Sequence, residues 1–390
     1  MKRDYWLKRI EEAWQTKSVL WLSGIRRAGK TTLCQMLPNT EYFDCELPST
    51  RRLMDDPESF LESNKGKRIV LDEIHRLFHP SELLKIAADY FPMTQLIATG
   101  SSTLGASRKF KDTLTGRKKE LWLTPMIDED LREFPDTEFG YPYRFLRGGL
   151  PLLFLSKSYP AQEFQEWIDS YWAKDIQELF RIQRKNSFQK CFELLLANSG
   201  GIFEATRYAA PCEVSRPTIS AYLEALEATF VMHVVRPFSS YKVTEIVSAP
   251  KVYGFDTGFI CHHKQMTTLR PEDMGMLWEH YVLNELHAFL QHRNICYWRD
   301  KRGHEIDFIL SNHQGRLIAI ECKWSVLQTP KVTNIDVFLR HYPQAEMYVV
   351  SANTLRPFQE KIGSHPVQFV NLPTLLSLLY SSDAVLTPRS

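Results

Sequence analysis

The stretch Gly24-Ile25-Arg26-Arg27-Ala28-Gly29-Lys30-Thr31 decides the fold of the first third of the chain. Its spacing, G-x-x-x-x-G-K-[ST], lies between the apolar run Val19–Leu22 and a helical pattern. Glycines at these positions let backbone N–H groups close around phosphate oxygens, and the start of the next helix adds partial positive charge. We therefore predict a phosphate-binding loop rather than a chance glycine-rich turn. The residues expected to contact a bound nucleotide are Gly24, Arg27, Gly29, Lys30, Thr31 and Thr32.

Two acids end the next apolar run, Ile69-Val70-Leu71-Asp72-Glu73. We expect Lys30 to reach the β- and γ-phosphates of ATP, while Thr31 and Asp72 hold Mg²⁺. Glu73 is then placed to orient and deprotonate the attacking water. The alternative is a strand that ends in a solvated acidic turn, which the phosphate-binding loop makes the weaker interpretation.

Two further residues are candidates for the hydrolysis step, each with an open alternative. Thr99 follows a third buried run, Leu96–Ala98, where it is placed to sense the γ-phosphate. The alternative is a capped turn that uses Ser101 or Ser102. Arg117, in the basic stretch from 108 to 119, is a candidate arginine finger for a neighbouring subunit. The alternative is a solvated basic loop.

The order of patterns along the chain predicts an α/β protein with three domains. Strands separated by helices in the first third indicate a parallel sheet. Helical spacing follows from about 128 to 197, and Ser215 caps a further helix before a β-like run at 230–235, which together indicate a winged helix. A helix at 278–290 and strands at 295–298, 304–310 and 316–323 come next. The predicted boundaries are 1–125, 126–250 and 251–390.

The last of these strands predict a cluster of charged side chains. Because side chains alternate along a strand, Glu305 and Asp307 share one face, as do Glu321 and Lys323. A three-residue loop, His313-Gln314-Gly315, would place Asp307 opposite Glu321 and Glu305 opposite Lys323.

This cluster has the chemistry of a magnesium site. The carboxylates of Asp307 and Glu321 are suitable Mg²⁺ ligands, and Lys323 can stabilise developing phosphate charge. Glu279, on the preceding helix, can supply a third acid. The alternative is an exposed sheet face with cross-strand ion pairs.

Five motifs together resemble a large group of bacterial and archaeal AAA+ ATPases that carry a C-terminal domain of unknown function. They are the 24–31 loop, Leu71-Asp72-Glu73-Ile74, Thr99-Gly100-Ser101-Ser102, Leu114-Thr115-Gly116-Arg117 and Arg147-Gly148-Gly149-Leu150-Pro151. The resemblance covers about residues 19–323. It implies an AAA+ core, a helical and winged-helix middle, and a C-terminal domain similar to the PD-(D/E)XK nuclease fold.

In the PD-(D/E)XK nuclease fold, the catalytic residues follow a pattern that this sequence resembles. The pattern takes Glu279 from a helix, Asp307 from one strand and Glu321-x-Lys323 from the next. Ile306 stands where the family name has proline, at a position that varies widely. Because such folds also persist as inactive binding modules, the resemblance leaves cleavage open.

Global charge does not decide whether the chain binds nucleic acid, since the net charge is only +2. Contacts to DNA must come from local groups. Candidates are Arg207, Arg216 and Thr218 in the winged-helix segment, Arg181, Arg184, Lys185 and Lys190 before it, and Trp298, Arg299, Lys301 and Arg302 beside the carboxylates. The alternatives are solvated basic faces and a winged helix that contacts protein.

Other classes are disfavoured by composition. No apolar run is long enough to cross a bilayer, and seven scattered cysteines without a C-x-x-C pair fit reduced thiols in a cytoplasm. We interpret Cys261-His262-His263 as ordinary loop residues rather than metal ligands.

Two hypotheses follow for the whole chain. In the first, it is an ATP-hydrolysing homo-oligomer that acts on duplex or branched DNA and cuts it with Mg²⁺. In the second, it is an ATP-driven switch that recruits a protein partner through an inactive nuclease-like domain.

Overall fold

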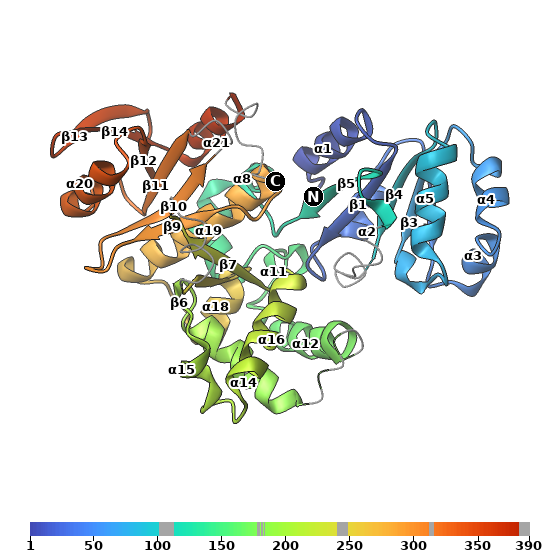
Figure 1. Ribbon diagram of the computed structural model, residues 1–390, viewed down its shortest axis with the longest axis horizontal. Helices are drawn as coiled ribbons and strands as arrows, with labels where there is room; N and C mark the ends of the chain where they lie inside the picture. The colour runs from blue at the N-terminus through green and yellow to red at the C-terminus, as the bar shows by residue number, and fades with distance from the viewer. Residues whose placement is uncertain are drawn as a thin grey trace. The chain divides into compact units, whose positions relative to one another are not determined.

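The computed structural model describes residues 1–100, 113–177, 180, 182, 184–239, 249–311 and 316–381 (Figure 1). The chain divides into two compact units. The first comprises Met1–Gly140, Gly149–Lys185 and Glu224–Val231, and the second comprises Tyr141–Gly148, Asn186–Leu223 and Met232–Ser390. The three-domain boundaries remain predictions.

The first unit contains a five-stranded parallel sheet in the order β2-β3-β4-β1-β5. The three predicted buried runs form its central strands and are covered on both faces, which is usual for parallel sheets. The strands are β1 (Val19–Gly24), β2 (Thr40–Asp44), β3 (Arg68–Asp72), β4 (Gln95–Thr99) and β5 (Lys118–Leu123).

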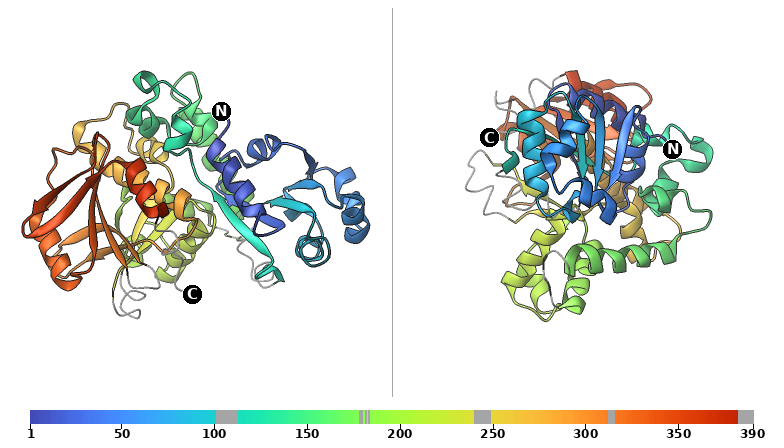
Figure 2. Two further views of the ribbon diagram at one scale, coloured as in Figure 1. Left: turned by 90° about the horizontal axis from the view of Figure 1, so that it is seen from above. Right: turned by 90° about the vertical axis from the view of Figure 1, so that its right-hand side faces the viewer.

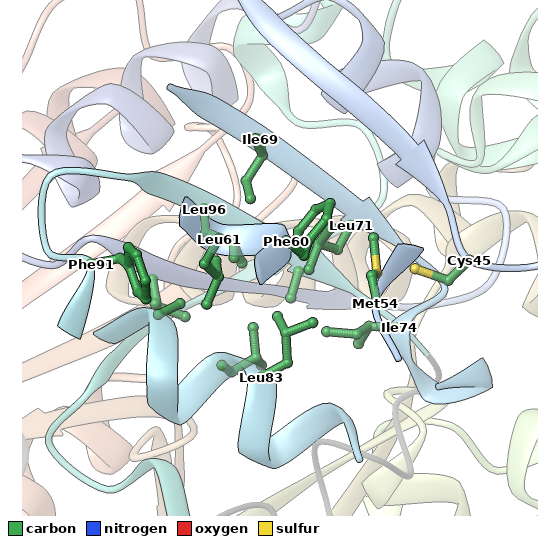
Figure 3. Packing of buried hydrophobic residues seen from close by; sticks show 14 of the residues in the cluster. Cys45, Met54, Phe60, Leu61, Ile69, Leu71, Ile74, Leu83, Phe91 and Leu96 are labelled. Carbon is green, nitrogen blue, oxygen red and sulfur yellow. The ribbon is translucent and has the colours of Figure 1, made fainter. Parts of the chain in front are cut away.

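The core of this unit is built from alternate residues of the central strands. Ile69 and Leu71 of β3 and Leu96 of β4 point to the same face, where α4 (Pro57–Ser63) and α5 (Pro80–Tyr90) pack on them (Figure 3). Helix α1 (Asp4–Trp14) packs on the same sheet and contacts β1 and β5. This packing fixes the carboxyl ends of β1, β3 and β4 at one edge of the sheet.

The remaining helices of the first unit are mostly short. One face of α12 is buried, since Phe164, Trp167 and Tyr171 lie in the core. A π-helical segment follows it directly. These elements are α2 (Lys30–Gln35), α3 (Pro48–Leu53), η1 (Ile74–Arg76), α8 (Asp128–Leu131), α9 (Asp136–Phe139), α11 (Pro151–Phe154), α12 (Ala161–Tyr171) and the π-helix η2 (Trp172–Gln177).

The second unit is built on a nine-stranded mixed sheet in the order β13-β14-β12-β11-β10-β9-β7-β8-β6. Strands β9, β10 and β11 are antiparallel neighbours, and β12 runs parallel to β11. Strands β9 to β14 are the orange to red arrows in Figure 2. The bounds are β6 (Gly201–Ile202), β7 (Met232–Pro237), β8 (Lys251–Gly254), β9 (Cys296–Arg299), β10 (Glu305–Ser311), β11 (Leu317–Lys323), β12 (Glu346–Ser351), β13 (Phe358–Ile362) and β14 (His365–Val370).

Helices of the second unit support this sheet. Ile335 and Phe338 of α20 join a core cluster with residues of the sheet, and α19 contacts β11. Helix α19 begins at Pro271, one and a half turns or more before the predicted start near 278, because Arg270 and Asp273 form a capping arrangement there. The helices are α10 (Tyr141–Arg147), α14 (Lys185–Ala197), α15 (Ala205–Ala209), α18 (Thr257–His263), α19 (Pro271–Leu290), α20 (Val332–His341) and α21 (Leu372–Ser381).

The middle of the chain runs α14, β6, α15, α16 (Arg216–Ala228), β7 and β8, with β8 pairing to both β6 and β7. Ser215 acts as the predicted cap of α16, because its Oγ accepts a hydrogen bond of 3.4 Å from the Thr218 backbone N–H. The prediction that 261–263 form a loop is wrong. These residues end α18, which begins where Asp256 accepts a hydrogen bond from the Gly258 N–H.

Within the described ranges, no helix is both long and apolar enough to span a membrane.

Candidate functional site

The loop at 24–31 turns sharply at its two glycines. Gly24 ends β1 opposite Leu123 of β5, with a φ of 133°. A Cβ at Gly24 would lie 2.3 Å from the Leu123 carbonyl oxygen, so only glycine lets β1 pair here and turn away. Gly29 has a φ of 95° and precedes the first residue of α2. The loop therefore has the shape that a phosphate group requires.

Lys30 lies folded over this loop. Its Nζ donates hydrogen bonds to the carbonyl oxygens of Gly24 at 2.9 Å and Ile25 at 3.1 Å. Burial lowers the pKa of Lys30, while the charges of Glu73 and Asp175 act in the opposite direction. The Lys30 Nζ is thus held against the loop carbonyls, where it could contact a bound anion.

Asp72 is the centre of a hydrogen-bonded group at the ends of β3 and β4. Thr31 Oγ1 donates to Asp72 Oδ2 at 2.8 Å, and the Tyr42 hydroxyl donates to the same oxygen. Thr99 donates to the other oxygen, Oδ1. The two residues predicted to share Mg²⁺, Thr31 and Asp72, are therefore in contact. Tyr42 was missed because one tyrosine on a half-buried strand carries no motif.

Glu73 lies next to this group with a φ of 53°. Its backbone N–H donates to Thr99 Oγ1 at 3.1 Å, and its carboxylate is 3.1 Å from His75 Nδ1. Burial alone would raise the pKa of Glu73, but the hydrogen bond and charge of His75 together with the charges of Lys30 and Arg26 outweigh burial, and the pKa is lowered. Glu73 is therefore ionised at neutral pH, as a general base must be.

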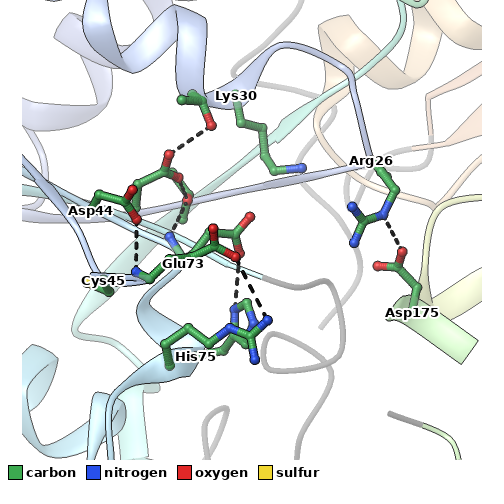
Figure 4. A network of polar contacts seen from close by, with 12 residues as sticks. Arg26, Lys30, Asp44, Cys45, Glu73, His75 and Asp175 are labelled. Atoms are coloured by element: carbon green, nitrogen blue, oxygen red, sulfur yellow. Dashed lines mark hydrogen bonds and ion pairs between the residues drawn. The ribbon is translucent and has the colours of Figure 1, made fainter. Parts of the chain in front are cut away.

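An ion pair holds the middle of the loop. Arg26 Nε lies 2.6 Å from Asp175 Oδ2, and Figure 4 shows the two side chains directed at each other. The Trp167 indole N–H also donates to the Arg26 carbonyl oxygen at 3.1 Å. Burial raises the pKa of Asp175, and the charge of Arg26 opposes that change. Asp175 was missed, since nothing but its place in an apolar helical run distinguishes it.

A pocket of about 540 Å³ opens over the loop. The lining includes the predicted Arg27, Thr31 and Thr32, together with Glu73. Residues 1–3 and the α11 segment from Pro151 to Leu155 supply further lining, including apolar side chains. Phosphate-binding groups on one side and apolar groups on another are what a nucleoside triphosphate needs.

The predicted register of the C-terminal hairpin agrees with the strand pairing. Phe308 pairs with Ile320 and Ser311 with Leu317. Continuing the same register by one residue sets Asp307 opposite Glu321. The loop residues His313-Gln314-Gly315 lie outside the described part of the chain.

Asp307, Glu321 and Lys323 form one group, in which Glu321 is buried and Asp307 and Lys323 are half-buried. Lys323 Nζ donates to Glu321 Oε1 at 2.7 Å, and Asp307 Oδ2 accepts a hydrogen bond of 2.8 Å from the Cys322 N–H. Glu321 is only 6% exposed, so the group is not a solvated sheet face. Burial raises the pKa of Asp307 and of Glu321 to about 7. Repulsion from Glu279 also raises the pKa of Asp307, and repulsion from Asp307 raises that of Glu321, while Lys323 and Lys251 act in the opposite direction.

Glu279 and Glu305 lie on the other side of this group and have different partners. Lys251 Nζ forms an ion pair with Glu305 and lies 3.6 Å from Glu279 Oε1. The Tyr253 hydroxyl donates to Glu279 Oε1 at 2.6 Å. Among the described residues, no three His, Cys, Asp or Glu side chains are arranged to hold a metal ion. Lys251 and Tyr253 were missed because they lie in a strand far away in sequence.

Comparison with known proteins adds the family of the first unit. Residues 16–133, which contain the phosphate-binding loop, Asp72 and Glu73, match the model of an AAA domain. This segment is a P-loop ATPase domain of the AAA+ type. Two later segments match domains of unknown function, DUF8612 over residues 139–270 and DUF4143 over residues 274–374.

Two curated relatives that match most of this chain are described as uncharacterized proteins. Two proteins, Rv2008c of Mycobacterium tuberculosis and Mb2031c of Mycobacterium bovis, are each 25% identical over 339 residues, which is 83% of this chain and 74% of theirs. Among solved structures, the Walker-type ATPase PABY2304 of Pyrococcus abyssi is 17% identical, with a TM-score of 0.45 over 67% of this chain and 95% of that one. The STAND protein PH0952 of Pyrococcus horikoshii is 13% identical, with a TM-score of 0.28 over 74% of this chain and 47% of that one.

Other predicted residues of the AAA+ domain have structural partners. Arg117 Nε lies 2.7 Å from Asp89 Oδ1, so in this chain it contacts its own domain. Its role as a finger concerns a neighbouring subunit and stays a prediction. Thr99 contacts Asp72 and Glu73. Ser101, Ser102, residues 108–112 of the basic stretch and Arg181 lie outside the described residues.

The basic residues proposed for DNA have exposed side chains where the structure describes them, and three of them form ion pairs. Lys190 pairs with Glu213 at 2.7 Å, and Arg299 lies 3.3 Å from Glu305 Oε2. Arg207 pairs with Glu204 at 3.2 Å. The other exposed candidates are Arg184, Lys185, Arg216, Lys301 and Arg302.

Proposed function

We propose that this AAA+ ATPase acts on DNA as a homo-oligomer and that its C-terminal unit cuts DNA with Mg²⁺. The observation that carries the proposal is the group of Asp307, Lys323 and the buried Glu321, which has the residue types of a metal-dependent phosphodiesterase. The resemblance to the PD-(D/E)XK fold supports the same interpretation.

For ATP hydrolysis, two residues of the loop and three at the ends of β3 and β4 have roles that their contacts support. Lys30 binds the β- and γ-phosphates once they displace its bonds to the loop carbonyls. Thr31 and Asp72 would hold Mg²⁺, since their oxygens already lie 2.8 Å apart. Glu73 accepts the proton of the attacking water. Thr99 keeps Asp72 and Glu73 in place through its two hydrogen bonds.

The C-terminal group fits one divalent cation. Glu321 Oε2 is buried without a hydrogen-bond partner among the described residues, and this is an oxygen that a cation would satisfy. Asp307 and Glu321 would be its protein ligands. When bound, Mg²⁺ would stabilise charge on a phosphate and lower the pKa of a bound water. Lys323 lies beside Glu321, where it can contact a phosphate oxygen.

Contact with DNA is supported by the middle of the chain. The order helix, strand, helix, helix and two strands suits a winged helix, in which α16 would be the recognition helix. Arg216 and Thr218 lie in its first turn, and Arg216 is exposed. Lys301 and Arg302 are exposed near the carboxylates in sequence and provide positive charge for a phosphate backbone.

Binding and cleavage of linear, forked and four-way DNA, with and without ATP and Mg²⁺, tests the proposal. We expect binding that weakens steeply with salt and stimulates ATP hydrolysis. Lys30→Ala should abolish ATP hydrolysis. Asp307→Asn should abolish DNA cleavage and leave ATP hydrolysis unchanged. Absence of DNA binding at low salt would refute action on DNA, and unchanged cleavage by Asp307→Asn would refute the site.

A second function is favoured by one observation: Lys251 already neutralises two of the cluster acids. In that case the C-terminal unit is an inactive docking module, and the chain is an ATP-driven switch for a protein partner. ATP hydrolysis that is indifferent to every DNA substrate, with a protein that co-purifies, would support this alternative.

A further inference from the structure

A lysine ammonium lies among the acids of the C-terminal cluster. Lys251 is the first residue of β8 and is 5% exposed, which is rare for a lysine without counter-ions. Its Nζ forms an ion pair with Glu305 Oε1 and lies 3.6 Å from Glu279 Oε1. Lys251 is thus a resident cation of the cluster.

Each of the two acids around Lys251 has a second partner. Glu279 Oε1 also accepts the Tyr253 hydroxyl at 2.6 Å, and Glu305 Oε2 lies 3.3 Å from the Arg299 guanidinium. Burial would lower the pKa of Lys251, but the charges of Glu279, Asp307 and Glu305 outweigh burial and the pKa is raised. The lysine is therefore charged at neutral pH.

Asp307 and Glu321 differ from this pair. Among the described residues they have only Lys323 and the Cys322 N–H as hydrogen-bond donors, and Glu321 Oε2 has no donor at all. Four carboxylates in the cluster face three cations, Lys251, Lys323 and Arg299, so further positive charge is needed to balance them. One divalent cation would supply it.

We propose that Lys251 takes the place of a second cation, so that the cluster binds a single divalent ion, at Asp307 and Glu321. The inference rests on the metal site of the proposed function. Sites with two metals place the ions about 3.5–4 Å apart, with carboxylates shared between them. Here Glu279 and Glu305 are held by an ammonium, which cannot coordinate a water or a phosphate as a metal does.

Counting bound Mn²⁺ on the nucleotide-free full chain, by the electron paramagnetic resonance signal of free Mn²⁺, tests the inference. Without nucleotide, the phosphate-binding loop contributes little to the count. We expect one ion per wild-type chain, lost in Asp307→Asn. Lys251→Met frees Glu279 and Glu305 and should raise the count to two. Lys251→Arg retains a cation and should keep one.

Lys323→Met is the matched control, since it removes a lysine from the Glu321 side and should not create a second site. If Lys251→Met does not fold, as judged by its thermal unfolding, Lys251→Gln retains a hydrogen-bond donor for Glu305 without charge and should bind two ions. One ion in both wild type and Lys251 variants overturns the inference but leaves the metal site intact. No ion in the wild type overturns the metal site, and the inference with it.

Discussion

Asp175 directs a carboxylate oxygen at Arg26 Nε, 2.6 Å away, in the middle of the phosphate-binding loop. The acid comes from a π-helical turn about 150 residues later, and it also influences the charge of Lys30. In the nucleotide-free chain, the carboxylate of Asp175 balances the positive charges of Arg26 and Lys30. A bound phosphate would carry the same charge into the same pocket, so Asp175 and the phosphate compete for these cations.

Asp175→Asn should therefore tighten ATP binding. The change removes repulsion toward the phosphates and releases Arg26, and we expect a dissociation constant about three- to tenfold lower, corresponding to ~1 kcal/mol. Equilibrium binding of ATP in a Glu73→Gln background measures it without hydrolysis. Asp169→Asn, on the exposed side of α12, is the control. Weaker binding would show that Asp175 positions Arg26 for phosphate instead.

Thr99 should matter for the rate of hydrolysis and little for ATP affinity. Its hydroxyl bonds Asp72 and the Glu73 N–H, so it positions the Mg²⁺ ligand and the base without covering the phosphate loop. Thr99→Val keeps the shape and removes both bonds, and we expect kcat to fall about tenfold or more. Thr99→Ser should restore most of it. An increase in KM with kcat unchanged would contradict this positioning role.

Gly24→Ala should destabilise the ATPase domain. Its Cβ would meet the Leu123 carbonyl oxygen at 2.3 Å, at a φ of 133° that alanine rarely adopts. We expect a loss of more than ~2 kcal/mol in the free energy of unfolding. Gly275→Ala is the matched control, because Gly275 lies within α19 and an added Cβ would have no neighbouring atom within 4 Å. Alanine there should stabilise the protein by about 0.5–1 kcal/mol. Chemical denaturation of both variants measures the difference.

His280 should make the second unit sensitive to acid. Burial lowers its pKa to about 4, and its neutral ring lies between Ser199 Oγ at 2.6 Å and the Met276 carbonyl oxygen at 2.8 Å. Below about pH 6.5 the unfolded chain takes up a proton that the folded chain refuses. Stability contributed by the neutral ring is thus present above that pH and is lost progressively as pH falls toward 4.

The wild-type free energy of unfolding should decrease between about pH 6.5 and pH 4. His280→Gln removes the titrating group, so this decrease should be smaller in the variant by roughly 2–3 kcal/mol. Thermal and denaturant unfolding at a series of pH values checks this. His341→Gln, at the exposed end of α20, should leave the wild-type profile unchanged. A His280→Gln profile as steep as wild type would assign the acid sensitivity to other groups.

Much of the fold follows from the sequence because its signals are local. Each central strand of the ATPase sheet is a short apolar run, and burial on both faces makes such runs conspicuous. The loop at 24–31 is a fixed spacing of glycine, lysine and threonine between a strand and a helix. The hairpin register follows from the alternation of side chains, since a shift of one residue would turn Asp307 away from Glu321.

The candidate sites follow only in part. Asp72, Glu73 and Thr99 end neighbouring strands, so parallel pairing brings them together in a way that sequence can anticipate. Tyr42, Asp175, Lys251 and Tyr253 are different, because each reaches its site from a segment that carries no motif.

The sequence by itself therefore determined that the chain has a phosphate-binding loop and a pair of facing carboxylates. The tertiary structure alone decided which charges surround them. An ion pair forms where two charged side chains lie close together and are shielded from water, and neither condition can be predicted from their positions in the sequence. For the loop at 24–31 the deciding partner is Asp175, and for Asp307 and Glu321 it is the lysine that neutralises the acids beside them.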